Sequence, residues 1–551
     1  MAKPASRTEG PRAKPVAALL LSLALMSACN EERSATSTTE KAAEPERPVV
    51  VTDRGSVRGV IDHETDVFRG IPYAAAPVGE LRFRPPQPPA AWDTVRDASK
   101  FGSPCPQRST FGVIIGDEDC LTLNLWRPSK PAREPRPVLV FIHGGANAIG
   151  SGSDPLQDGR ALANDHDVIV VTINYRLGLL GFLAHPALTT ESATSGNWAY
   201  LDQIAALEWI ARNIAAFGGD PGRVTLFGES AGALSVCVLL ASPRATGLFH
   251  AAIMQSGGCD VATLAQRERE GQQLLSRSPC ASAADPIACL RGLSSAQLVE
   301  LAPAKVDDIS NWALPIGGAI DGHVLPASPW DRFAAGTHNV VPTLVGSNAD
   351  ETEMLTPATL RGCPAYEFAT REAFADFADE VLAQYPCADY PGGRHAFVAA
   401  TTDAIFTCQA RRILRSLAPA AAERSVPLFR YFYTYVRADP AIRELRAFHG
   451  AEIQLLFDTM TRFGYKPPPR EQTVADAMQA SWAAMAATGS PIHEGTPRWQ
   501  PYELARDNAV IFDAPVAAVD GIGTSHCDFW DAKVDREGVL PPTDPRGSDF
   551  R

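Results

Sequence analysis

The sequence has no excess of positive charge, no apolar run long enough to span a membrane and no common metal-binding motif. Its 551 residues carry 50 basic and 63 acidic side chains, a net charge of −13, so no nucleic-acid-binding surface is expected. A bilayer-spanning helix needs about 20 consecutive apolar residues, and no run of that length occurs. C-x-x-C, H-E-x-x-H and EF-hand patterns are also missing, so neither a metal site nor a cofactor is predicted.

Cysteine is too dilute for a disulfide scaffold, because only 11 are spread over the chain, yet this is many for a cytosolic enzyme. The apolar fraction of 45% excludes wholesale disorder. The length allows either several small domains or one large catalytic domain. Since no internal repeat and no composition change occurs after residue 48, we predict that 49–551 form one large domain.

The N-terminus has the layout of an export signal. A basic stretch precedes an apolar run of 11 residues, Val16–Met26, and small residues follow. The ending Met26-Ser27-Ala28-Cys29 resembles a bacterial lipobox, although its first position is usually Leu. We interpret 1–28 as a signal peptide and Cys29 as a lipidated first residue; the alternative is an ordinary secretory signal cut near Ala28.

Residues 29–48 contain almost no large apolar side chain, so they cannot bury enough surface to offset chain entropy. We predict a flexible tether. The expected location is the bacterial cell envelope, with membrane contact only through the lipid anchor, or secretion from the cell.

The body of the chain alternates short apolar runs with helical patterns. This alternation predicts an α/β fold with a large, mostly parallel central sheet flanked by helices on both faces, with long insertions. A hairpin is expected at 49–52 and 56–59, and a Gly-rich turn at 218–222. The expected strands are 137–143, 168–173, 223–227, 250–255 and 343–346, and the expected helices are 201–214 and 233–240.

A candidate nucleophile stands between a strand and a helix. Gly228-Glu229-Ser230-Ala231-Gly232 fits the G-x-S-x-G pattern and lies in the strand–turn–helix context that this pattern needs. Glycines allow the flanking backbone to approach closely, and the turn would project the Ser230 hydroxyl above the sheet. The pattern alone also occurs by chance, but its context favours a nucleophile.

A second loop has the composition of an oxyanion hole. His143–Asn147 reads His-Gly-Gly-Ala-Asn and follows a predicted buried strand, as HGGG-type loops do. The backbone N–H groups of Gly145, Ala146 and Ala231 would bind a developing negative oxygen. A simple Gly-Gly turn is the alternative interpretation.

These motifs and several others occur in the order found in type-B carboxylesterases of the α/β-hydrolase fold, the group that includes cholinesterases. The sequence resembles this family from about residue 49 to 531. The segments that carry the resemblance are Phe68–Ala74, Leu81–Phe83, Trp92, Glu118–Asn124, Asn174–Arg176, Gly196–Asn197, Leu201–Gln203, Phe217–Pro221, Gly228–Gly232, Gln255–Gly257, Asn348–Glu351, His449–Glu452 and Phe529–Trp530.

The resemblance implies a catalytic triad of Ser230, Glu351 and His449. The family places its acid at the Glu of N-x-D-E and its base at the His of H-G-x-E, and the chain order agrees with α/β-hydrolases. His449 would activate the serine, and Glu351 would orient the imidazole and stabilise its charged form. Neighbouring Asp350 is an alternative acid. By the same analogy Glu229, Ser256 and Glu452 form a supporting polar network.

Two departures from the family pattern concern specificity. The third position of the oxyanion loop is Ala146 rather than Gly; alanine keeps its N–H, so donation is expected if φ there is negative. Asn147 replaces a residue that is often aromatic and changes the wall beside the acyl group. The segment 106–119 lacks the cation-binding Trp of cholinesterases, so cholinesterase activity is not predicted.

The resemblance also implies three disulfides, and it suggests a fourth between Cys363 and Cys387 more weakly. Cys237 lies in an apolar helix and is interpreted as a buried small hydrophobe, whereas Cys259 has no assignment. The implied pairs are Cys105–Cys120, Cys280–Cys289 and Cys408–Cys527.

The predicted function is hydrolysis of carboxylic esters through an acyl-enzyme, with a small-molecule ester as substrate. Alternatives with the same mechanism are a lipase, a lactonase or a polyester hydrolase. A non-catalytic binding protein on the same fold is the alternative from another class, but such relatives typically lack the serine. The sequence does not indicate an acyl chain length, an alcohol or an oligomeric state.

Overall fold

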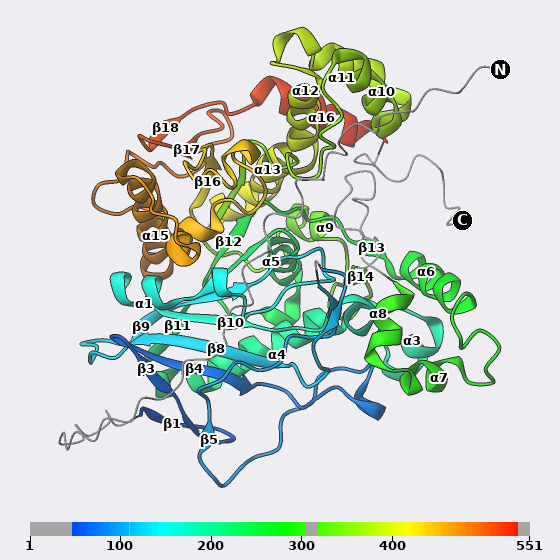
Figure 1. The fold of residues 1–551 in the computed structure, drawn as a ribbon, viewed down its shortest axis with the longest axis vertical. Coiled ribbons are helices and arrows are strands. Elements are labelled where there is room, and N and C mark those ends of the chain that lie inside the picture. The colour runs from blue at the N-terminus through cyan, green and yellow to red at the C-terminus, as the bar shows by residue number, and fades with distance from the viewer. Residues whose placement is uncertain (1–46, 110, 303–316, 538–551) are drawn as a thin grey trace, which may run out of the picture.

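A computed structural model describes residues 47–109, 111–302 and 317–537. Residues 1–46, which include the predicted signal peptide, Cys29 and most of the predicted tether, lie outside the described residues. An 11-stranded sheet runs through the molecule in the order β18-β17-β16-β15-β12-β11-β9-β10-β8-β4-β3 (Figure 1). Its strands are β3 (Val60–Asp62), β4 (Thr65–Pro72), β8 (Thr122–Pro128), β9 (Arg136–Ile142), β10 (Ile169–Ile173), β11 (Gly219–Glu229), β12 (Ala251–Gln255), β15 (Thr343–Asn348), β16 (Leu428–Tyr433), β17 (Ala509–Phe512) and β18 (Ala517–Val519).

The middle of this sheet is parallel and its two edges are antiparallel. All neighbours from β10 through β9, β11, β12, β15 and β16 to β17 run parallel. The pairs β10–β8, β8–β4, β4–β3 and β17–β18 are antiparallel. The predicted mostly parallel central sheet is therefore confirmed.

Strand β9 shows how the sheet builds a core on each face. Val138, Val140 and Ile142 belong to one buried cluster, whereas Leu139 and Phe141 belong to another, as the period of two in a strand requires. The first cluster includes side chains of α4 (Trp198–Asn213), α5 (Ala231–Ala241), α9 (Pro329–Ala334) and α13 (Cys408–Glu423). The second includes side chains of α1 (Arg160–His166), α14 (Ile453–Leu456) and α15 (Pro469–Thr488).

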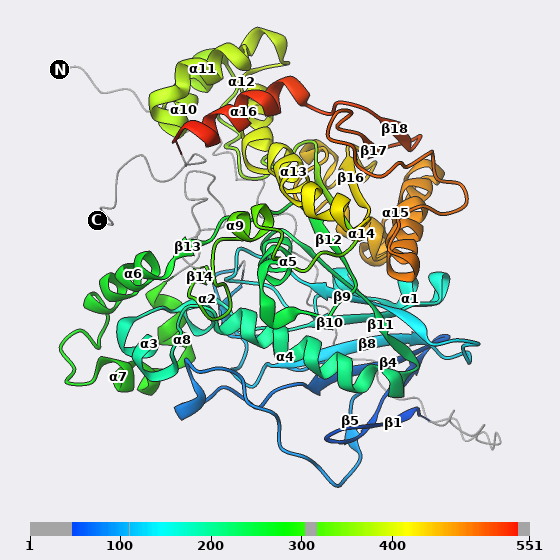
Figure 2. The same cartoon turned by 180° about the vertical axis from the view of Figure 1, so that it is seen from behind.

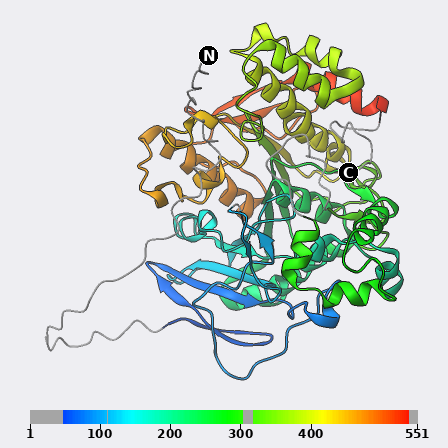
Figure 3. The ribbon, with the colours of Figure 1, turned by 45° about the vertical axis from the view of Figure 1, so that its right-hand side comes forward.

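Smaller elements occupy the periphery. The hairpin β1 (Val49–Thr52) and β2 (Gly55–Arg58) pairs with β5 (Arg96–Asp97) at one end of the molecule. Helices α10 (Cys363–Phe374), α11 (Ala378–Gln384), α12 (Gly393–Thr402) and α16 (Thr524–Glu537) gather at the opposite end and share a third core (Figure 2). Helices α6 (Leu264–Ser276), α7 (Pro286–Gly292) and α8 (Ser295–Leu301) lie on the side away from α15 (Figure 3).

The remaining elements are short. They are β6 (Gln107–Arg108), β7 (Ile114–Ile115), β13 (Ala262–Thr263), β14 (Ala319–Ile320), α2 (Gly178–Phe182) and α3 (Pro186–Ser192), with 3₁₀ turns and one π-helical turn, Asp403–Thr407.

The predicted turn at 218–222 is wrong in extent. Gly218 does turn the chain, with φ of 81°, but Gly219 already pairs with β9 and the strand continues to Glu229. A shift of register between Gly219 and Val224 accommodates the intervening residues. Positions 219 and 224 of β11 pair with positions 136 and 138 of β9, so the residues between them, whose composition favours a turn, bulge out of the strand pairing.

Five disulfides cross-link the described residues. Three join the pairs implied by the family resemblance, and a fourth joins Cys363 to Cys387. Cys237 is buried, as interpreted, and the disulfide that it forms with Cys259 was not predicted; this bond joins α5 to the segment that follows β12. Five disulfides are typical of proteins in oxidising compartments and indicate an extracytoplasmic location.

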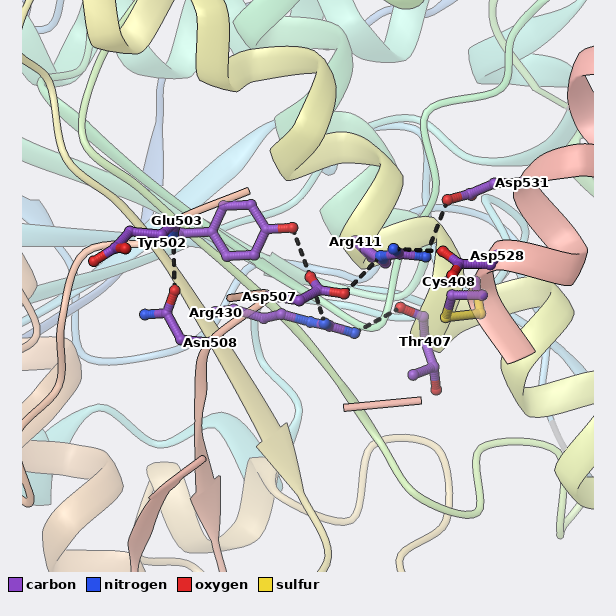
Figure 4. A network of polar contacts seen from close by, with 11 residues as sticks. Thr407, Cys408, Arg411, Arg430, Tyr502, Glu503, Asp507, Asn508, Asp528 and Asp531 are labelled. Carbon is purple, nitrogen blue, oxygen red and sulfur yellow. Dashed lines mark hydrogen bonds and ion pairs between the residues drawn. A yellow bond between two sulfur atoms is a disulfide. The ribbon is translucent and has the colours of Figure 1, made fainter. Parts of the chain in front are cut away.

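A buried ion-pair network links helix α16 to the rest of the fold (Figure 4). Asp507 forms an ion pair with Arg411, 2.6 Å from its Nε, and accepts a hydrogen bond from Arg430 Nη1 at 3.1 Å. The other Arg411 nitrogens reach Asp528 and Asp531 of α16 at 2.7 and 3.2 Å. Because both guanidinium groups are almost fully buried, the shared carboxylate keeps their charges paired. The network joins α13, β16 and α16 beside the Cys408–Cys527 disulfide.

Candidate active site

Ser230 occupies a sharp turn between β11 and α5. Its φ of 58° and ψ of −124° are rare for a residue with a side chain, and its N–H donates to Gln255 O at 2.8 Å. A Cβ on Gly228 would lie 2.5 Å from the Gly232 carbonyl carbon, and one on Gly232 would lie 2.1 Å from Ile142 O. Both glycines are therefore needed to bring strand, turn and helix together.

The Gly-rich loop packs directly against this turn. A Cβ on Gly144 would lie 2.9 Å from Ser230 Cβ and 2.8 Å from Glu229 Oε2. The condition placed on Ala146, a negative φ, is not met: φ is 102° at Gly145, 53° at Ala146 and 60° at Asn147. A turn stabilises this left-handed backbone. The N–H groups of Ala148 and Ile149 both donate to Gly145 O. In turn conformations, successive backbone N–H groups can form an anion-binding concavity.

His449 binds Glu351, not Asp350. Its Nδ1 lies 2.6 Å from Glu351 Oε2, and the Glu351 side chain is fully buried. Asp350 instead pairs with Arg446 at 2.8 Å and accepts from Ala447 N at 3.2 Å. The structure thus brings together the predicted acid and base, whereas the alternative acid is paired with Arg446.

The other imidazole nitrogen faces the residue before Ser230. His449 Nε2 lies 3.3 Å from Oε1 of Glu229, the residue that precedes Ser230. A Cβ on Gly450 would lie 3.4 Å from the same carboxylate oxygen, so the His449 loop packs closely on the turn. The two ring nitrogens therefore connect Glu351 on one side with the Ser230 turn on the other.

The predicted supporting residues Glu229, Ser256 and Glu452 differ in the contacts that they make. Glu452 accepts from Gln255 Nε2 at 3.0 Å and from Asn348 Nδ2 at 2.6 Å, and the Asn348 N–H donates to Glu351 Oε1 at 2.7 Å. The Ser256 hydroxyl is buried and makes no hydrogen bond to the described residues. Its short side chain does not reach Glu452, whereas the longer Gln255 side chain does.

Comparison with known proteins identifies the family. Residues 46–530 match the Carboxylesterase family. The chain belongs to the carboxylesterase family.

Several known proteins align with most of the carboxylesterase chain. It is 37% identical to a fumonisin B1 esterase of Sphingopyxis macrogoltabida, with 88% of the chain and 90% of that protein aligned. It is 34% identical to a para-nitrobenzyl esterase of Bacillus subtilis (strain 168), with 85% and 95% aligned. A solved PNB esterase structure matches with a TM-score of 0.75 and 32% identity, covering 88% of this chain and all of that one. The protein has the α/β-hydrolase fold and is a serine hydrolase that cleaves carboxylic esters.

Electrostatics at the carboxylesterase site favour a charged imidazole. Burial by itself lowers the pKa of His449, but Glu229 and Glu351 outweigh it and raise this pKa to about 9. Burial also raises the pKa of Glu229, and the neighbouring Glu452 and Glu351 charges raise it further, while His449 opposes them. Glu229 and His449, whose side chains lie 3.3 Å apart, therefore shift each other's pKa.

The described residues contain no cluster of three or more His, Cys, Asp or Glu side chains arranged to hold a metal ion. Within the same ranges, no helix has the length and apolar character that crossing a bilayer requires.

Three residues of the site were not assigned from the sequence. Gln255 and Asn348 stand inside segments that carry the family resemblance, but nothing in the sequence showed that their amides bind Glu452. Trp482 donates from Nε1 to Gln255 Oε1 at 3.1 Å across 227 positions of sequence, and no local pattern predicts that contact.

Proposed function

We propose that this carboxylesterase works through an acyl-enzyme formed on Ser230. His449 takes the hydroxyl proton as Ser230 attacks the ester carbonyl, and it returns the proton to the departing alcohol. Glu351 holds the Nδ1–H tautomer and stabilises the imidazolium. Water activated by His449 then releases the acid and frees Ser230.

The observation that carries this proposal is the position of the His449 ring. Nδ1 is bound to a fully buried carboxylate, and Nε2 is directed at the turn that displays Ser230. General-base activation of a serine needs this arrangement, in which one nitrogen is held by an acid and the other is presented to the nucleophile.

The N–H groups of Gly145, Ala146 and Ala231 are proposed to hold the oxyanion. Ala231 begins α5, so its N–H has no acceptor within the helix and the positive end of the helix dipole lies at the same place. The loop that carries Gly145 and Ala146 packs on Ser230, as the close approach of Gly144 demonstrates. Preorganised donors of this kind supply much of the barrier reduction in acyl transfer.

We further propose that residues 49–551 act as one catalytic domain, tethered by 29–48 to a lipid on Cys29 after removal of 1–28. The export signal and the lipobox-like ending in the sequence support this arrangement, as do the five disulfides. Labelling of cells with a radioactive fatty acid tests it: Cys29→Ser removes the label if the anchor is present.

An ester series tests the activity and begins to define the substrate. Hydrolysis of p-nitrophenyl acetate, butyrate, octanoate and palmitate is measured with purified wild type. We expect turnover of at least the shorter esters and a chain-length optimum that reflects the acyl site. A folded protein that hydrolyses none of these esters, and none of a set of ethyl esters, contradicts the proposed function. A maximum at palmitate supports a lipase instead.

The pH dependence of kcat/KM follows from the raised proton affinity of His449. The reaction needs the neutral imidazole, and the pKa of His449 is about 9, so activity rises with pH up to that region and is lost below it. Glu229→Gln removes the negative charge beside His449 Nε2, so we expect the acid limb of the pH profile, the range in which activity rises with pH, to move to lower pH. Initial rates for ethyl butyrate in a pH-stat check both statements, and an unchanged limb in Glu229→Gln contradicts the electrostatic explanation.

A further inference from the structure

Hydrogen bonds lead from helix α15 through Gln255 to Glu452, and each bond has a defined direction. An indole N–H can only donate. Because Trp482 Nε1 lies 3.1 Å from Gln255 Oε1, the amide oxygen of Gln255 must face the indole. The amide nitrogen of Gln255 then faces Glu452 Oε1, 3.0 Å away, as a donor. Trp482 thus orients the Gln255 amide so that its nitrogen, and not its oxygen, faces the Glu452 carboxyl.

Asn348 is oriented in the same manner from the other side. Its Nδ2 donates to the carbonyl oxygen of Phe448 at 2.8 Å, and a carbonyl oxygen can only accept. The same nitrogen donates to Glu452 Oε2 at 2.6 Å. Both carboxyl oxygens of Glu452 therefore receive N–H donors whose orientation is fixed by a second partner.

This arrangement favours the charged form of Glu452. Burial raises the pKa of Glu452 and the Glu351 charge raises it further, whereas the hydrogen bond from Asn348 lowers it. The two amide N–H donors oppose burial, because they bind a carboxylate more strongly than a neutral carboxyl. The titratable groups that interact with Glu452 come from several elements. They are His449 beside α14, Glu351 after β15, Glu229 of β11, and Tyr431 and Tyr433 of β16.

Among these groups, His449 is the one that becomes positive. Burial raises the pKa of the two tyrosines well above 10, so they stay neutral. The carboxyls of Glu229 and Glu351 are acids like Glu452 itself. A carboxylate at Glu452 is thus a buried negative charge whose favourable partner is the imidazolium.

We propose that Trp482, Gln255 and Asn348 are positioning residues that hold Glu452 as a carboxylate, and that this charge stabilises the imidazolium of His449 during the reaction. The inference rests on the proposed function, in which His449 carries the serine proton. None of the three residues touches the ester. Gln255 also joins this network to the nucleophile, because its carbonyl oxygen accepts the N–H of Ser230.

Trp482→Phe tests the first link, because it removes the N–H donor and keeps an aromatic ring. The freed Gln255 amide can turn its oxygen toward Glu452, which then gains a proton. We expect the acid limb of kcat/KM to move to lower pH by about half a unit or more. Gln255→Leu removes one donor to Glu452 directly and should move the acid limb in the same direction. This variant replaces Trp482→Phe in the test if Trp482→Phe does not fold.

Trp499→Phe is the matched control. Trp499 is equally buried and contacts the same ring, with centroids 5.7 Å from Phe512 against 6.0 Å for Trp482. Its Nε1 makes no hydrogen bond to the described residues. Loss of packing would affect both variants alike. Only Trp482→Phe also removes a hydrogen bond, so Trp499→Phe should leave the pH profile unchanged.

A double-mutant cycle with Glu452→Gln decides whether the effect runs through that carboxylate. Glu452→Gln should shift the limb to lower pH, and adding Trp482→Phe should shift it no further. An equal shift by Trp482→Phe in both backgrounds overturns the proposal, as does an unshifted limb in the folded single variants. A wild type without Ser230-dependent ester hydrolysis would instead contradict the proposed function, so the two failures are distinguishable.

Discussion

Ser230→Ala is expected to lower kcat for ester hydrolysis by about 10⁴- to 10⁶-fold, because no other group at the turn can form the acyl-enzyme. The residual rate would come from oxyanion donors and substrate binding, which the substitution leaves in place. Ser230 sits at φ 58°, and alanine is no more strained there than serine, so the folded structure should survive. Burst and steady-state kinetics with p-nitrophenyl butyrate measure the loss.

Ser256→Ala is the matched control for this substitution. Ser256 also follows a sheet strand, also has a positive φ of 53°, and its hydroxyl has no hydrogen-bond partner among the described residues. We expect a change of less than about tenfold, as for substitutions outside the reacting groups. Activity in Ser230→Ala comparable with that of Ser256→Ala would refute the nucleophile assignment.

Glu351→Gln is expected to reduce kcat by about 10⁴-fold, the usual cost when the triad acid becomes an amide. The local hydrogen bonds dictate the orientation of the new side chain. Oε1 of residue 351 accepts from the Asn348 N–H, so the amide oxygen stays there and the NH₂ group faces His449 Nδ1. His449 would then carry its proton on Nε2 and could not take one from Ser230.

Asp350→Asn separates this effect from a general change in loop charge. Asp350 neighbours Glu351 in sequence, but it pairs with Arg446 and accepts a hydrogen bond from Ala447 N. Kinetics of both variants on one ester decide between the two acids. A large loss in Asp350→Asn with near-normal activity in Glu351→Gln would reverse the assignment.

The sequence predicts the parts of this site that have strong local patterns. The apolar runs that became β9, β10 and β12 are buried on both faces of the sheet, and this composition identifies them as central strands. The turn at Ser230 needs two glycines at fixed spacing, and the packing around Gly228 and Gly232 explains why. Such constraints act over a few residues and are therefore visible in the sequence.

Features that depend on distant segments could not be predicted. The bond between Cys237 and Cys259 forms because β12 brings the segment after it beside α5, and an apolar helix does not reveal that proximity. The positive φ of Ala146 is imposed by the turn around Gly145 O, against the preference of alanine. Trp482 enters the network only because α15 packs on the same face of the sheet as the His449 loop.

The most direct test of the central claim is to locate the residue modified by a fluorophosphonate, which reacts with an activated serine. The wild-type protein is inactivated with the reagent, digested and analysed by mass spectrometry, with Ser230→Ala treated in parallel. We expect one adduct, on Ser230, whose amount rises as ester hydrolysis is lost and which does not form in Ser230→Ala. An adduct on another residue that accompanies inactivation, or full hydrolytic activity retained by Ser230→Ala, would contradict the central claim.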